Sequence, residues 1–121
     1  MNAPTLLLVA LGGALGSVAR ALAGVLVPAG RLPWATLLVN VAGSLLIGWL
    51  IARFAGANEA SLRAQSFWVV GVCGGFTTFS SFSWQTIALM QKGDWPAAAA
   101  NILLSVSLCL LATWIGWRLG Q

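Results

Sequence analysis

Long apolar stretches dominate this chain, and its few charged residues separate them. Three uncharged runs cover residues 32–52, 64–91 and 95–117, and each has the roughly 20 residues that an α-helix needs to cross a bilayer core. A fourth run starts near the N-terminus and continues past Arg20 to Val27. The pattern predicts an all-α membrane protein, a single domain over all 121 residues. Its four transmembrane helices are expected at residues 5–27, 34–54, 64–90 and 96–119.

The composition supports a membrane protein and argues against several classes of function. Hydrophobic residues make up 60% of the chain and charged residues only 7%, whereas a soluble domain carries about 25% charged residues. The net charge of +4 is spread over all the predicted loops, so no basic cluster indicates nucleic-acid binding. The only acidic residues, Glu59 and Asp94, lie in predicted loops. Without a carboxylate inside a span, neither proton-coupled transport nor enzyme chemistry is expected.

Basic residues are divided evenly between the two sides of the predicted bundle. Four spans place the N-terminus, the link at residues 55–63 and the C-terminus on one side. That side holds Arg53, Arg63 and Arg118, and the other holds Arg20, Arg31 and Lys92. Since the positive-inside rule then gives no preferred orientation, we expect insertion in both orientations (dual topology) and an antiparallel homodimer. The alternative is that the equal count is a coincidence in a small sample.

Polar side chains form a stripe on each of two predicted helices. The stripes consist of Thr36, Asn40 and Ser44 on the second span and of Asn101, Ser105, Cys109 and Thr113 on the fourth. Residues four positions apart share one face of a helix, and polar groups within a span face the protein interior or a water-filled cavity. The stripes are therefore either a polar track or a set of hydrogen bonds that join helices.

Small residues four positions apart occur on three of the predicted helices. The pairs are Gly12 and Gly16, Ser44 and Gly48, and Gly71 and Gly75. This spacing lets the backbones of neighbouring membrane helices approach closely. Four short helices in such contact enclose little more than their own core, so we expect that a pathway needs a second subunit.

The stretch GGFTTFSSFS, residues 74–83, places two glycines and five hydroxyl groups inside the third run. As one straight helix that run would be about 42 Å long, about 10 Å more than the hydrocarbon core. We therefore expect the third helix to be broken in mid-membrane, at Gly74–Gly75 followed by Thr77–Thr78. Unwound backbone in a membrane must be buried in protein or line water, and its carbonyl groups bind cations. The alternative is a glycine kink that serves packing alone.

Three phenylalanines recur at every third position of the same stretch, and Phe79 and Phe82 share a face. The edge of an aromatic ring is electropositive, so rings presented edge-on attract an anion without a fixed charge. Such weak binding suits conduction, and the Asn40 amide can donate hydrogen bonds to the same ion. These residues fit an anion pathway, but aromatic residues at this spacing also fit an ordinary core.

Three stretches resemble the signature sequences of the Fluc, or CrcB, fluoride channel family. They are GGALGSVAR (12–20), ATLLVNVAGSLLIG (35–48) and GGFTTFSSFS (74–83). With the layout of four spans, the resemblance covers nearly the whole chain. The third stretch is the most specific, because it is similar to the family pattern GG-x-TTFSTF. Ser81 replaces the second threonine of that pattern, which keeps the hydroxyl and loses a methyl group.

The resemblance implies a passive channel that exports fluoride from the cytoplasm across the cell inner membrane. It also implies an antiparallel homodimer in the lipid bilayer, with two pores and a central structural sodium ion. The matching positions for the fluoride pore are Phe79, Phe82, Asn40, Ser105, Thr36 and Ser81.

The resemblance also assigns residues outside the fluoride pore. Gly74 and Thr77 would give backbone carbonyls to sodium. Arg20 closes the first signature and is either a charge at the pore mouth or a membrane anchor. Cys109 stands where the family often has a serine, and a thiol is a weaker donor than a hydroxyl.

Two other classes of function compete with a channel. One is a coupled transporter, either a fluoride/proton antiporter or an exporter of small cations, and the lack of an embedded carboxylate argues against it. Small multidrug exporters, for example, depend on an acidic residue in the first helix. The other is a structural or assembly protein in which the polar stripes only join helices.

Overall fold

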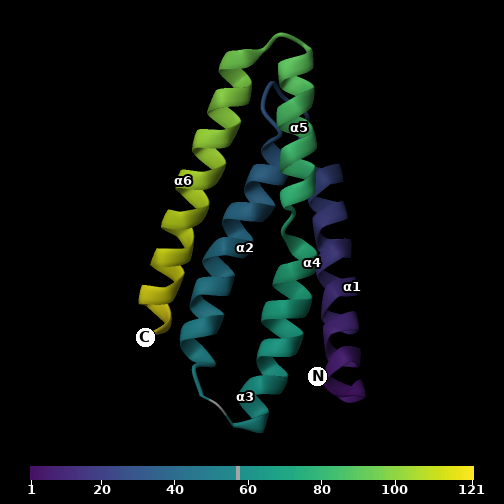
Figure 1. The fold of residues 1–121 in the computed structure, drawn as a ribbon, viewed down its shortest axis with the longest axis vertical. Coiled ribbons are helices and arrows are strands. Elements are labelled where there is room, and N and C mark those ends of the chain that lie inside the picture. The colour runs from purple at the N-terminus through teal and green to yellow at the C-terminus, as the bar shows by residue number, and fades with distance from the viewer. Residues whose placement is uncertain (57) are drawn as a thin grey trace.

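The computed structural model describes residues 1–56 and 58–121, and this part of the chain is helical without a β-strand. The elements are α1 (Ala3–Leu26), α2 (Trp34–Arg53), α3 (Glu59–Ala64), the π-helix η1 (Gln65–Cys73), α4 (Gly74–Phe76), α5 (Phe79–Gln91) and α6 (Trp95–Gly120). Figure 1 shows α1, α2 and α6 as long helices, with α3, α4 and α5 following one another along a further column.

Three helices in the described residues are long and apolar enough to cross a membrane, namely α1, α2 and α6. All three begin and end close to the bounds predicted from the sequence. The predicted third span, residues 64–90, is not a single helix, because it is divided among η1, α4 and α5. The prediction of an all-helical membrane protein is thus confirmed, whereas the fourth crossing stays a prediction.

Thr77 and Thr78 separate α4 from α5. Both residues have extended backbone, with ψ of 159° at Thr77 and φ of −153° at Thr78. The Thr77 hydroxyl donates to the carbonyl of Cys73 at 2.9 Å and so helps to close the preceding helix. The Thr78 hydroxyl accepts from the N–H of Ser81 at 3.2 Å, as an N-cap that starts α5. Two threonines therefore make the interruption, and the glycine pair expected there is helical within α4.

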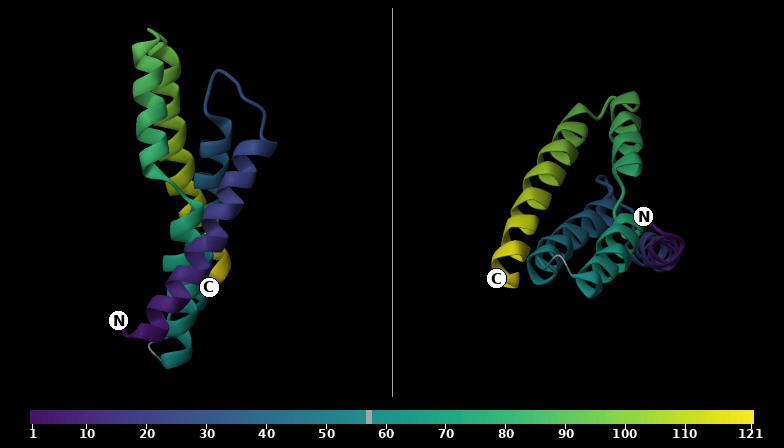
Figure 2. Two further views of the ribbon diagram at one scale, coloured as in Figure 1. Left: turned by 90° about the vertical axis from the view of Figure 1, so that its right-hand side faces the viewer. Right: turned by 60° about the horizontal axis from the view of Figure 1, so that its bottom comes forward.

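Glycines let the long helices meet at backbone distance. A Cβ added to Gly12 of α1 would lie 3.0 Å from the backbone nitrogen of Val72 in η1. A Cβ added to Gly48 of α2 would lie 2.9 Å from the backbone nitrogen of Trp117 in α6. Two closely packed pairs result, α1 with η1 and α4, and α2 with α6, as the spacing of small residues predicts. Figure 2 shows α5 and α6 joined by a short turn into a hairpin.

An ion pair joins the loop between α1 and α2 to the turn between α5 and α6. The Arg31 guanidinium donates to the two carboxylate oxygens of Asp94 at 2.7 and 2.8 Å. Gly93 shapes the turn, since its φ of 77° lies in the left-handed region that glycine adopts without strain. Asp94 also accepts from the N–H of Ala97 at 3.3 Å. One carboxylate therefore caps α6 and holds the neighbouring loop.

The stability contributed by this ion pair should depend on pH. The pKa of Asp94 lies below its ordinary value because Arg31 donates a hydrogen bond to the carboxylate. A carboxyl with a lowered pKa stabilises the folded state above its unfolded pKa, and this contribution is lost as the pH falls through the folded pKa. The unfolding temperature in detergent should therefore be higher for the wild type than for Asp94→Asn at pH 7. This difference should disappear below about pH 3. A gap that stays constant down to the lowest pH would contradict this role.

Candidate functional site

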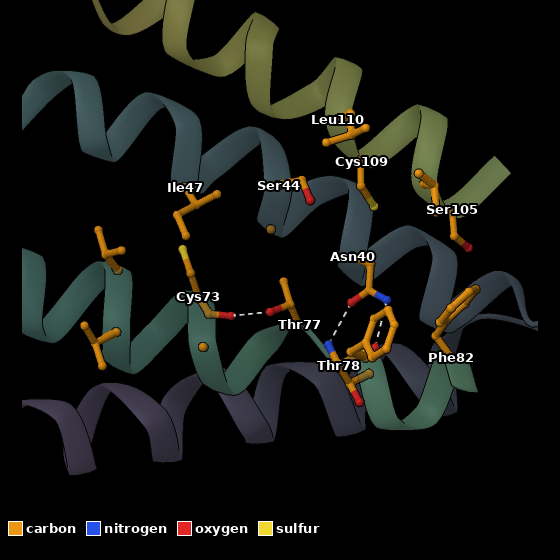
Figure 3. A pocket seen from close by; sticks show the side chains of 16 residues that line it. Asn40, Ser44, Ile47, Cys73, Thr77, Thr78, Phe82, Ser105, Cys109 and Leu110 are labelled. Carbon is orange, nitrogen blue, oxygen red and sulfur yellow. Dashed lines mark hydrogen bonds between the residues drawn. The ribbon is translucent and has the colours of Figure 1, made fainter. Parts of the chain in front are cut away.

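Two cavities flank the interrupted helix, and Thr78 lines both of them. The first encloses about 590 Å³ and is lined from α2, η1, α4, α5 and α6 (Figure 3). Six of the residues predicted for fluoride or sodium line it, namely Asn40, Gly74, Thr77, Phe79, Phe82 and Ser105. The second encloses about 510 Å³ and is lined by the other three, Arg20, Thr36 and Ser81.

The fold thus gathers the predicted site residues around one point, the backbone between α4 and α5. Cys109 also lines the first cavity. Asn101 and Thr113 belong to the same stripe on α6 but line neither cavity. The stripe is therefore divided, and only its middle faces the first cavity.

The side-chain amide of Asn40 makes two hydrogen bonds with the backbone of Thr78, one through its oxygen and one through its nitrogen (Figure 3). Its Oδ1 accepts from the Thr78 N–H at 2.7 Å, and its Nδ2 donates to the Thr78 carbonyl at 2.9 Å. An unpaired backbone group buried away from water costs about 1–3 kcal/mol, so this pairing is a strong local constraint. An asparagine amide has two N–H donors, and the second one stays available at the wall of the cavity.

Arg20 of α1 reaches the same interruption from the other side. Its Nη1 donates to the carbonyl of Thr77 at 3.0 Å. A positive charge at the C-terminal end of a helix interacts favourably with the free carbonyl groups there. Arg20 and Asn40 therefore hold two consecutive extended residues from two different helices, within a single protomer.

The family resemblance implies that the carbonyl groups of Gly74 and Thr77 hold sodium, and the structure gives these two groups different surroundings. In an unbroken helix the Gly74 carbonyl would accept from the N–H of Thr78, but that N–H donates to Asn40. The Gly74 carbonyl is thereby released. The Thr77 carbonyl accepts from Arg20 and keeps a second lone pair. Both carbonyls therefore keep a free lone pair, although the positive charge of Arg20 beside Thr77 disfavours a second cation there.

The two aromatic rings of the predicted pore lie together at the start of α5. The ring centroids of Phe79 and Phe82 are 5.3 Å apart and the planes are tilted by 44°. Their exposures differ widely, since Phe82 is 9% exposed and Phe79 is 76% exposed. One ring is thus held inside the protomer and the other projects from it.

Three polar residues near the site were not predicted to act there. Gln85 lines the second cavity, and its buried Oε1 has no hydrogen-bond partner within residues 1–56 and 58–121. Thr86 and Asn101 are hydrogen-bonded to each other at 2.9 Å. All three are polar residues inside predicted spans, which is itself a signal of function or helix pairing. Asn101 was placed in a stripe, but its partner on α5 was not foreseen.

Ser105 of α6 is buried and lines the first cavity. Its hydroxyl donates to Oδ1 of Asn101 at 3.4 Å, near the limit for a hydrogen bond. Such a weak bond leaves the hydroxyl able to turn toward the cavity. Ser105 can therefore present either a donor or an acceptor there.

The fold and the site define a helical membrane protein with two cavities beside an interrupted helix. The family model described as "CrcB-like protein, Camphor Resistance (CrcB)" matches residues 7–117. The chain belongs to this family.

Curated relatives support the assignment over nearly the full length. The "Fluoride-specific ion channel FluC" of Paramagnetospirillum magneticum is 50% identical, with 93% of this chain and 91% of the relative covered. Proteins of the same name from Opitutus terrae and Geobacter sulfurreducens are 48% and 44% identical. The alignments cover 91% of this chain and 87% of the first relative, and 93% of both chains for the second. The relatives are named as channels, in agreement with the expectation that this chain is not an enzyme.

Proposed function

We propose that this protein is a passive, fluoride-selective channel that exports fluoride from the cytoplasm. The observation that carries the proposal is its identity of 50% to a fluoride-specific ion channel over 93% of its length. The positions of the predicted pore residues around the two cavities support it. Of the two acidic residues, Glu59 begins α3 and Asp94 caps α6, and neither lines either cavity.

Fluoride would pass the interruption between the two cavities in contact with weak, uncharged donors. The free N–H of Asn40 and the electropositive edges of Phe79 and Phe82 would face the ion from the first cavity. The hydroxyls of Thr36 and Ser81 would serve the second cavity. Amide and hydroxyl donors can approach a small anion of high charge density closely. The absence of a full charge at the rings keeps binding weak enough for release.

The transport would need no energy source besides the membrane potential. Hydrogen fluoride crosses the membrane as a neutral acid and ionises in the more alkaline interior. The potential, negative inside, then drives the anion outward through the pore. This direction of flow is consistent with the inner membrane as the site of action.

The complete channel would be an antiparallel homodimer of dual topology with two pores. The first cavity, of about 590 Å³ in one protomer, has room for many waters, and a partner that covers it would narrow the pathway. The exposure of Phe79 is consistent with a ring that packs on the partner. The carbonyls of Gly74 and Thr77 from both protomers would hold the structural sodium ion, whose charge would stabilise carbonyl groups facing one another.

Fluoride flux across a pH gradient tests passive conduction against proton coupling. In proteoliposomes at a fixed membrane potential, a passive channel should give the same fluoride flux with and without an imposed pH gradient. An antiporter would instead move fluoride against its own gradient when protons supply the energy. Flux that follows the pH gradient at zero potential, after subtraction of the hydrogen fluoride leak in protein-free liposomes, would contradict the proposal.

Substitutions of Arg20 should show whether its charge attracts fluoride to the pore mouth or only anchors the helix in the membrane. A fixed positive charge beside the pathway raises the local anion concentration, by about tenfold or more at low salt. Arg20→Gln should therefore lower fluoride efflux by about tenfold at low ionic strength and remove much of its salt dependence, whereas Arg20→Lys should keep that dependence. Efflux would be measured over a range of salt concentrations. Equal salt dependence in wild type and Arg20→Gln would show that the charge does not act on the ion.

A further inference from the structure

A chain of hydrogen bonds runs from the first cavity to the backbone of Phe82. Ser105 donates to Asn101 at 3.4 Å, and Nδ2 of Asn101 donates to the Thr86 hydroxyl at 2.9 Å. Thr86 in turn donates to the carbonyl of Phe82 at 2.8 Å. Every donor in the chain points the same way, from α6 toward the turn of α5 that carries the Phe82 ring.

The middle of this chain is deeply buried. Asn101 is 2% exposed and Thr86 is 5% exposed, so each depends on the other to satisfy its polar group. Their bond is the one side-chain hydrogen bond between α5 and α6 in the part of the chain that the structure describes. The bond therefore links the turn of Phe82 to α6, which itself packs mainly along α2.

Ser83 makes the same kind of bond to the other aromatic residue of the predicted pore, Phe79, and so allows a comparison. Its hydroxyl donates to the carbonyl of Phe79 at 2.9 Å, the same local bond that Thr86 makes to Phe82. A hydroxyl that bonds four residues back alters the local helix geometry. Ser83, however, has no further partner on α6 among the described residues. The link to another helix is thus particular to the turn of Phe82.

We propose that Thr86 and Asn101 are positioning residues that set the orientation of the Phe82 ring for fluoride. The inference rests on the proposed channel function. A ring attracts an anion with its edge and repels it with its face, so conduction depends on how the ring is turned. Asn101 fixes Thr86, and Thr86 fixes the backbone from which the ring projects.

The test compares fluoride efflux and thermal stability in reconstituted dimers of five proteins. They are the wild type, Thr86→Val, Thr86→Ser, the double variant Thr86→Val with Asn101→Leu, and Ser83→Ala. Thr86→Val should lower fluoride efflux by about tenfold, the factor that corresponds to one hydrogen bond. Thr86→Ser keeps the hydroxyl, so its efflux should be close to that of the wild type. Ser83→Ala should change efflux by less than about twofold, because its bond has no link to α6.

The double variant separates positioning from stability. Replacing both buried partners with apolar groups of similar shape removes the donor and the acceptor of their bond together and can be nearly neutral for stability. The Ser105 hydroxyl, which loses its weak acceptor on Asn101, can turn toward the first cavity. We therefore expect it to regain thermal stability relative to Thr86→Val while its efflux stays low. Wild-type efflux in the double variant, or an equal loss in Ser83→Ala, would overturn the inference and leave the channel function intact. A wild type that releases no fluoride would overturn both.

Discussion

Replacing Asn40 with leucine is expected to abolish fluoride efflux and to destabilise the protein. The substitution removes both hydrogen bonds to the backbone of Thr78 and the remaining N–H that would face the ion. Two buried backbone groups left without partners cost about 1–3 kcal/mol each. The two hydrogen bonds and the lost donor to the ion, at about 1 kcal/mol each, together correspond to a decrease in efflux of about 100-fold. The measurement is fluoride release from liposomes, together with thermal unfolding in detergent.

Asn40→Asp separates the folding role of this residue from its contact with the ion. An aspartate keeps the oxygen that accepts from the Thr78 N–H but sets its second oxygen against the Thr78 carbonyl. The variant should therefore form the interruption with one of the two hydrogen bonds and unfold at a lower temperature than the wild type. It loses both amide donors and adds a negative charge to the anion pathway, where like charges repel. We expect a folded protein that releases almost no fluoride. Fluoride release at the wild-type rate from this variant would exclude Asn40 from the pathway.

Gly16→Ala is expected to prevent stable packing of α1 on the interrupted helix. The new Cβ would lie 2.7 Å from the backbone nitrogen of Phe76 and closer still to the carbonyl oxygen of Val72. Neither backbone atom can move away without displacing a helix, so the cost should reach about 3 kcal/mol or more. Because Phe76 directly precedes Thr77, the displacement should also disturb the contact of Arg20 with the Thr77 carbonyl.

Gly24→Ala on the same helix is the matched control. No atom lies within 4 Å of a Cβ built at Gly24, and alanine favours a helix over glycine by about 1 kcal/mol. This variant should be as stable as the wild type or slightly more stable in thermal unfolding. Equal effects of the two substitutions would show that α1 does not pack on η1 and α4 as described.

The helices were predictable because membrane spans leave strong signals in a sequence. Charged residues mark the ends of apolar runs, and Pro96 begins the last helix where its missing N–H costs nothing. The spacing of Gly12 and Gly16 also predicted a close helix contact. The region from Gln65 to Cys73 gave no such signal, since a π-helix depends on packing that local sequence does not encode.

The sequence pointed to residues that the fold brings to the two cavities, but not to how they are held there. The motif at residues 74–83 and the polar stripes named the residues that line the two cavities. They did not show that Thr77 and Thr78 carry the interruption instead of Gly74 and Gly75. That choice depends on hydrogen bonds from Arg20 and Asn40, which are distant in sequence. Pairs such as Thr86 and Asn101 were equally hidden, because helical periodicity fixes a face but not its neighbour.

The most direct test of the channel function is fluoride efflux from liposomes that contain the purified protein. Release would be followed with a fluoride electrode under a potassium diffusion potential, and chloride release would be measured in parallel. The channel proposed here should release fluoride rapidly and chloride very slowly. A well-folded protein that releases no fluoride, or releases both anions alike, would contradict the account.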